Sequence, residues 1–164
     1  MGVDIHMFIC RKGEILEEDI FDGRNSQWFN NLQHQHYDNE YDHLNIRYGF
    51  SDDVPENLRK RFNDPGSYYG HHNIRVGDFA EWFEKYRPDL DAGWFSTYDR
   101  WRIERKGWVP DSDYVKHELE EGDNPVDYEF VEFEDKYDCS RWLYHYMANK
   151  KIPYDATINY CFDS

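Results

Sequence analysis

The stretch VDIHMFIC, residues 3–10, decides which fold class we expect for this chain. Its odd-numbered positions are all aliphatic or thioether side chains, whereas its even-numbered positions are Asp4, His6, Phe8 and Cys10. Successive side chains of an extended strand point to opposite faces, so this alternation predicts a β-strand with one apolar face. The turn residues 11–13 follow, and we expect them to lead back into a short segment over residues 14–16.

Outward from this strand, apolar spacing and capping residues predict several helices and two further strands. The helices are expected over residues 26–32, 55–62, 76–86 and 140–149. The first follows a turn at residues 21–24, and the second and last are expected to be capped by Asp53 and Ser140. Strands are expected over residues 128–133, with a bulge at Val131, and over residues 157–162.

The order of these elements predicts an α+β fold, with one domain spanning residues 1–164. We expect a small antiparallel or mixed sheet packed by a few helices, together with long irregular loops. Residues 33–53 show no clear period, so they are expected to form the longest polar loop.

The charge of the chain restricts its partners. Nineteen Lys and Arg against 34 Asp and Glu give a formal net charge of −15, so we expect neither direct nucleic-acid binding nor a membrane partner. Aromatic residues make up 19 %, which favours a folded core despite the charge.

Three scattered cysteines and the lack of a basic leader or long apolar run predict a cytoplasmic protein. Homo-oligomerisation is left open.

Asp4 and His6 lie two residues apart on the first strand, so both project to one face. They could converge there on a metal, a phosphate or a substrate proton. With His71 they would make a carboxylate and two imidazoles, a workable set for zinc, manganese or iron. The alternative is that Asp4 and His6 bond neighbouring groups and that His71 belongs to a surface turn. We therefore assign no cofactor, with a divalent metal kept as the alternative.

The residues around Arg24 form a second candidate for chemistry. Arg24 offers a planar donor fork suited to phosphate or carboxylate, Asn25 follows it, and Trp28 could stack on a base. The alternative is that Arg24 pairs with Asp4 or another acid and that Trp28 belongs to the core. An unpaired buried carboxylate is costly, so we expect Asp4 and Arg24 to lie within hydrogen-bonding or one-water reach at the end of the first strand.

Two further stretches have unusual composition. Residues 94–108 interleave aromatic and basic side chains, as a nucleotide-binding surface does, with Trp101 placed to stack and Arg102 to hold phosphate. A half-buried strand pair with outward arginines would have the same composition. Residues 111–138 hold twelve acids and two bases, which predicts either a mimic of duplex DNA or a solvated acidic face.

Short blocks spread over nearly the full chain carry a resemblance. They are the opening MGVDIH, Gly23-Arg24-Asn25, residues 49–53, Gly70-His71-His72 and the terminal Phe162-Asp163. In this order they resemble a family of small proteins encoded mainly by bacteriophages, whose chains open Met-Gly-Cys-Asp-Ile-His. Val3 stands in place of the family's cysteine, so no thiol chemistry carries over to that position. The resemblance implies a phage origin and a shared site of Asp4, His6, Arg24, Asn25 and His71, but names no reaction.

Phages carry many small proteins that disable host defence, so by analogy we expect a counter-defence protein in the host bacterial cytoplasm. The first hypothesis is capture, without turnover, of a small anionic nucleotide such as a cyclic dinucleotide or an ADP-ribose-like immune signal. Its ligand-binding residues would be Asp4, His6, Arg24, Asn25, Trp28, His71, Trp101 and Arg102, and no catalytic residue is assigned. The alternatives are a metal-dependent phosphodiesterase or hydrolase, and an acidic DNA mimic that inhibits a basic host defence protein.

Overall fold

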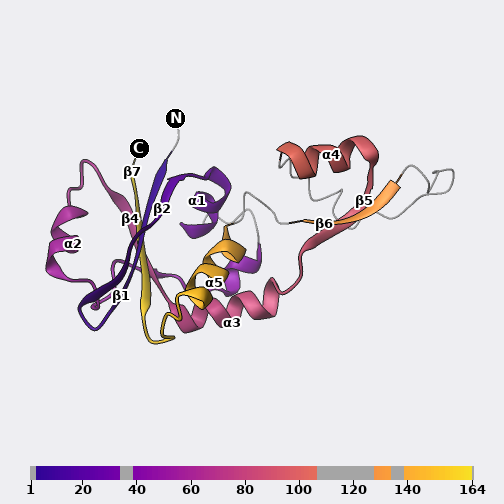
Figure 1. The fold of residues 1–164 in the computed structure, drawn as a ribbon. Helices are drawn as coiled ribbons and strands as arrows, with labels where there is room; N and C mark the ends of the chain where they lie inside the picture. Colours follow the sequence, from indigo (N-terminus) through magenta and orange to yellow (C-terminus); the bar gives the residue numbers. More distant parts are fainter. Residues whose placement is uncertain (1–2, 34–38, 107–127, 134–138, 164) are drawn as a thin grey trace.

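The main feature of the computed structural model, which describes residues 3–33, 39–106, 128–133 and 139–163, is a five-stranded sheet. Its order is β2-β1-β7-β4-β3, and each of these neighbouring pairs is antiparallel. The strands are β1 (Asp4–Arg11), β2 (Glu14–Arg24), β3 (Arg47–Tyr48), β4 (Tyr69–Arg75) and β7 (Thr157–Asp163). The strands expected nearest the two ends of the sequence therefore lie side by side within the sheet, with Asp4 opposite Asp163 (Figure 1).

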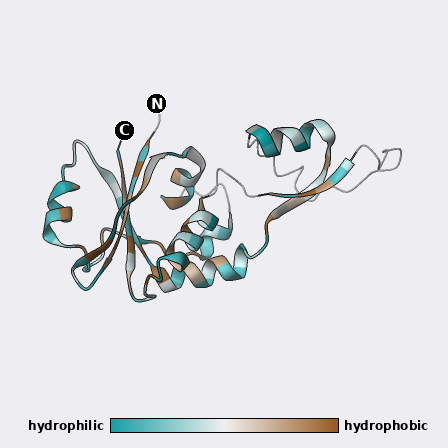
Figure 2. Ribbon diagram, in the orientation of Figure 1, coloured by the Kyte–Doolittle hydropathy of each residue, from teal (hydrophilic) through white to brown (hydrophobic). Residues whose placement is uncertain are grey.

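Helices cover both faces of this sheet. On one face lie α1 (Ser26–Leu32), α3 (Val76–Tyr86) and α5 (Ser140–Asn149), and on the other lies α2 (Glu56–Arg61) (Figure 1). Ile5, Met7 and Ile9 of β1 face the larger core, with α1, α3 and α5. Phe8 and Cys10 face a smaller core under α2. Figure 2 shows the contrast between hydrophobic central strands and the hydrophilic outer turns of the helices.

A second, two-stranded sheet lies apart from the first, beyond the end of α3 (Figure 1). It pairs β5 (Asp91–Ser96) with β6 (Tyr128–Phe133), and α4 (Thr97–Lys106) packs against both strands. The register is continuous, with Val131 opposite Gly93, so the expected bulge at Val131 is wrong. Apart from β6, the acidic stretch 111–138 lies outside the described residues.

The α+β class is confirmed, as are the helices expected near residues 26–32, 55–62, 76–86 and 140–149 and the strands near residues 3–10, 128–133 and 157–162. The expected turn at residues 21–24 is wrong because β2 continues to Arg24. Extra residues bulge out of β2 opposite Met7–Cys10, and Asp19 there has a φ of 48°. These bulges break the period-two pattern, which is why the sequence indicated only a short segment.

Other differences have equally local causes. β4 was not predicted because its register shifts between Tyr69 and His72, which hides the alternation. The expected loop at residues 33–53 contains a short 3₁₀ helix, η1 (Asn39–His43), and β3. Of residues 94–108, the first three end β5 and residues 97–106 form α4, whereas the last two lie outside the described residues. Neither expected cap acts as one: α2 follows Pro55, and α5 follows Cys139, which makes Ser140 its first residue.

Candidate functional site

Asp4 and Arg24 are cross-strand neighbours at one end of the sheet, and they form the contact that the sequence predicted. The Nε of Arg24 donates a hydrogen bond to Oδ1 of Asp4 at 2.7 Å. The carboxylate, through this bond and its charge, raises the pKa of Arg24 above its ordinary value. The arginine side chain is 62 % exposed, and no described residue bonds its two terminal nitrogens. Asp4 therefore holds the guanidinium through Nε alone. The two terminal nitrogens, which we call the open fork, stay available to a ligand.

His6 lies one pleat further along β1 and is held by Asp163, the last residue of β7. Its Nε2 donates to Oδ2 of Asp163 at 2.7 Å, because an ionised carboxylate only accepts. The imidazole contacts Phe62, at 5.7 Å between ring centroids, and the edge of Tyr68, at 5.4 Å. Within the described part of the chain, nothing bonds its Nδ1. His6 is therefore oriented through one nitrogen and keeps the other for a ligand or a proton.

These four side chains form one group, which we call the terminal cluster: Asp4, His6, Arg24 and Asp163. Asp4 and Asp163 face each other across β1 and β7, and the charge of Asp163 acts on Arg24. Outside the cluster, Arg61 lies over the Phe62 ring at 4.9 Å and pairs with Glu18 and Asp19 at 3.6 and 3.8 Å. The cluster thus joins the guanidinium of Arg24 and the imidazole of His6 to the carboxylates of Asp4 and Asp163 at the edge of the smaller core.

The expected metal set does not assemble. His71 lies on the same face of the sheet, but its Nε2 contacts the carbonyl oxygen of Phe62 at 2.6 Å, and its ring packs on Phe50. Phe62 contacts both histidines. Across the described ranges, no group of three or more His, Cys, Asp or Glu side chains is placed to hold a metal ion.

Asn25 and Trp28 serve the fold instead of lining the cluster. The side-chain oxygen of Asn25 accepts from the backbone N–H of Trp28 at 2.9 Å and so caps α1. Trp28 is fully buried and packs edge-on against Phe21. Its ring has no face open to a base, so the expected stacking role is wrong and the core interpretation is correct.

Trp101 lies on α4, away from the terminal cluster (Figure 1). It is 42 % exposed and stacks on Tyr98 at 6.2 Å between ring centroids. Arg102 belongs to the same helix, but its side chain lies outside the described part of the structure. The sequence prediction thus combined two places: Asp4, His6 and Arg24 come together, whereas Trp101 does not join them.

The sequence analysis missed one member of the terminal cluster, Asp163, and one neighbour of it, Tyr68. In the sequence, Asp163 is only part of a terminal Phe-Asp block, because its pairing with His6 depends on the β1–β7 register. Tyr68 precedes β4 in a stretch with no distinctive motif, yet its ring closes one side of His6. An aspartate at the end of an alternating strand was the only available signal.

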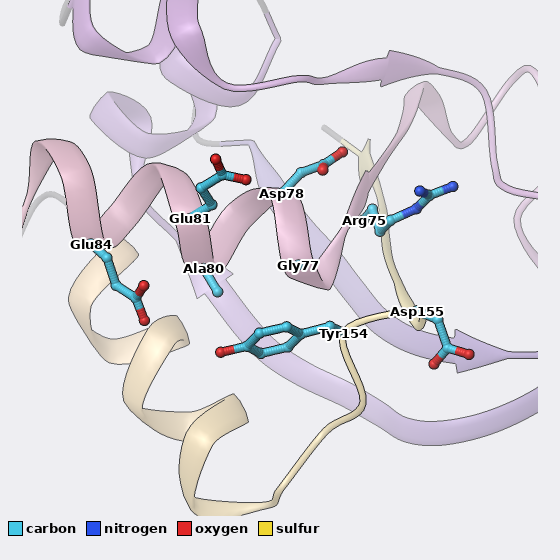
Figure 3. Close-up of a pocket in the computed structure, with 8 residues that line it drawn as sticks. All are labelled: Arg75, Gly77, Asp78, Ala80, Glu81, Glu84, Tyr154 and Asp155. Carbon is cyan, nitrogen blue, oxygen red and sulfur yellow. The ribbon is translucent and has the colours of Figure 1, made fainter.

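A second polar feature lies along α3, where no site was predicted (Figure 3). It is a cleft of about 440 Å³. Three acids spaced three residues apart on α3 line it, together with Asp155 and Tyr154 from the segment before β7 and the single base Arg75. The three acids are Asp78, Glu81 and Glu84. Asp155 is held by Arg11, which donates from Nε and Nη2 at 2.7 and 3.0 Å.

No family model, curated protein or solved structure matches this chain. The phage-family resemblance therefore stays a prediction, and function must be argued from the chemistry of the sites. Among the described helices, none is long and apolar enough to cross a membrane.

The two features differ in the chemistry that they allow. The terminal cluster presents an open guanidinium fork beside a carboxylate-oriented imidazole, which suits phosphate binding or proton transfer. Cys161 lies opposite His6 on β7, but burial raises the pKa of its thiol to about 12, so it stays protonated and is a poor nucleophile. The α3 cleft has an excess of carboxylates and suits a cation.

Proposed function

We propose that this protein is a phage counter-defence protein that captures a small anionic nucleotide immune signal at the terminal cluster and holds it without turnover. The observation that carries the proposal is the open fork of Arg24. Asp4 fixes the guanidinium through Nε alone, so the two terminal nitrogens can take two phosphate oxygens without breaking the ion pair. A cyclic dinucleotide or an ADP-ribose-like molecule supplies such phosphates.

Neighbouring groups support the same ligand class. Protonated His6 would donate from Nδ1 to a second phosphate oxygen, and Tyr68 beside it offers a phenol and a ring. The net charge of −15 opposes anions at long range, but at physiological salt the Debye length of about 8 Å limits that repulsion to nearby acids. Two of these acids, Asp4 and Asp163, are already paired with Arg24 and His6.

Calorimetry tests this proposal. Sequestration acts by mass action, so at least one signalling nucleotide should bind with a nanomolar Kd, about −12 kcal/mol. The panel is cyclic di-GMP, cyclic di-AMP, cyclic GMP-AMP and ADP-ribose, with inorganic phosphate as the minimal anion. Arg24→Lys keeps the charge but removes the fork and should weaken binding at least tenfold.

Arg11→Lys is the matched control. Arg11 lies at the opposite end of β1 and is also paired with an aspartate, but both Nε and Nη2 are already used there. Its substitution should change the Kd less than twofold. Absence of heat and of any thermal shift across the panel would reject capture, as would equal weakening by the two variants.

The second candidate is a hydrolase, which the His6–Asp163 pair specifically favours. A histidine held by a carboxylate through Nε2 can accept a proton from water at Nδ1, which is the arrangement of a general base. A divalent metal would then have to be held largely by the substrate, since His71 is engaged elsewhere. Mass spectrometry after heat denaturation separates the two candidates: intact nucleotide supports capture, and product that disappears with His6→Gln or with chelator supports hydrolysis.

A further inference from the structure

The outer face of α3 carries two adjacent hollows. The acid-lined cleft of about 440 Å³ lies on one side of Tyr154 (Figure 3). On the other side, between α3 and α5, lies a hollow of about 320 Å³ lined mainly by apolar side chains, among them Val76, Met147 and Ile152. Ala80 and Tyr154 line both, so the two hollows form one continuous surface, which we call the α3 face.

The three acids of α3 form no ion pair within the described ranges, although Arg75 lies at the same cleft. Glu81 has no partner within the described ranges, and Asp78 accepts only a long hydrogen bond, 3.3 Å, from Asn45. Glu84 accepts from the hydroxyl of Tyr144 at 2.6 Å, which leaves its charge in place. Arg11 compensates Asp155 alone. Carboxylate oxygens therefore remain available to a cation that enters from outside.

Tyr154 is fixed between the hollows by its backbone. The amide of Gly77 donates to its carbonyl oxygen at 3.0 Å, and a Cβ at position 77 would lie 3.2 Å from that oxygen. The segment before β7 thus packs closely on the start of α3. Tyr154 is 65 % exposed, and its ring can lie under a guanidinium in a cation–π contact.

We propose that the α3 face binds a basic segment of a partner protein, with one apolar side chain in the hollow and neighbouring arginines along the cleft. Charge complementarity selects the arginines, and the 320 Å³ hollow is large enough for a leucine or phenylalanine. From Gly77 to Glu84 the helix spans roughly 10 Å, a length covered by about three residues of extended chain. A small cation would occupy only part of the cleft and would leave the apolar hollow empty.

This site is independent of the proposed nucleotide site. Arg11, which holds Asp155 beside the α3 face, and Asp4 lie at opposite ends of β1, about 23 Å apart along the strand. Nucleotide and peptide should therefore bind without competing.

Fluorescence anisotropy at physiological salt provides the test, with two labelled peptides as probes. The first has four arginines around a central leucine, and the second has serine in place of the leucine. We expect the leucine peptide to bind the full chain about tenfold tighter. Ala148→Phe, which fills the hollow from the exposed end of α5 without changing charge, should remove that difference.

Charge specificity is tested by a matched pair of variants. Asp78→Asn combined with Glu81→Gln should weaken both peptides about tenfold. Glu14→Gln combined with Glu56→Gln removes the same charge from exposed positions elsewhere and should change binding less than twofold. Equal binding of the two peptides, or equal weakening by the two double variants, would overturn the proposal, because either result indicates nonspecific attraction to an acidic protein.

Discussion

Replacing Gly70 with alanine should destabilise the protein by about 2–5 kcal/mol and loosen the terminal cluster. Gly70 has a φ of 65°, where a side chain costs roughly 1–2 kcal/mol. A Cβ there would lie 2.5 Å from Cδ2 and 2.9 Å from Cε2 of Phe162. Phe162 is fully buried against Phe29, so its ring cannot turn aside freely, and such overpacking costs about 1–3 kcal/mol more.

Urea unfolding followed by tryptophan fluorescence measures this loss, and Gly49→Ala separates its two causes. Gly49 has a φ of 80°, but nothing lies within 4 Å of a Cβ placed there, so its variant should lose only the backbone part. Phe162→Leu should cost less stability when added to Gly70→Ala than when made alone, because the smaller side chain relieves the clash. Equal destabilisation by the two glycine variants would refute the reasoning. Asp163 follows Phe162, so Gly70→Ala should also weaken nucleotide binding.

Three further predictions concern side chains that do not belong to the terminal cluster. Asn159→Leu should lower the free energy of unfolding by about 2–4 kcal/mol, because it removes three hydrogen bonds of a fully buried amide; a loss under about 1 kcal/mol in urea titrations would contradict this. Cys10 and Cys161, with thiol pKa values raised to about 12 by burial, should resist alkylation at pH 8 until urea unfolds the protein, and labelling of either in the native state would count against the burial. The bond to Glu84, followed by burial, raises the pKa of Tyr144 to about 12, so its stabilising effect should be present below pH 10 and lost between pH 10 and 12. Glu84→Gln should return the phenolate absorbance change toward pH 10, and an unmoved titration would assign the shift to another cause.

The sequence predicted the elements whose pattern is uninterrupted. β1 was identified from its alternation, and the Asp4–Arg24 contact followed because an arginine close in sequence was the nearest compensating charge. The helices with regular apolar spacing were also found. In each case the information lies within a window of about ten to twenty residues, which is the range that local periodicity covers.

The rest of the candidate site depends on pairings that no local window contains. His6 and Asp163 are 157 residues apart in sequence, and their contact requires the register between β1 and β7. Trp28 shows a different difficulty. An aromatic residue in the first turn of a helix can face either a ligand or the core, and the local sequence does not decide between the two. In the sequence, the α3 acids are typical of an ordinary solvated helix face. Only the neighbouring hollow, which the structure shows, distinguishes them from such a face.

The place of β7 in the sheet has a consequence for how the fold is reached. β7 lies between β1 and β4, and its partners on β1 are about 150 residues earlier in the sequence (Figure 1). Contacts of such separation form late, and until they do β1 and β4 each present an unpaired edge. At high concentration two refolding chains could therefore exchange this strand. The swapped dimer would have every backbone hydrogen bond of the monomer's sheet. It would differ from the monomer only in the path of the segment before β7.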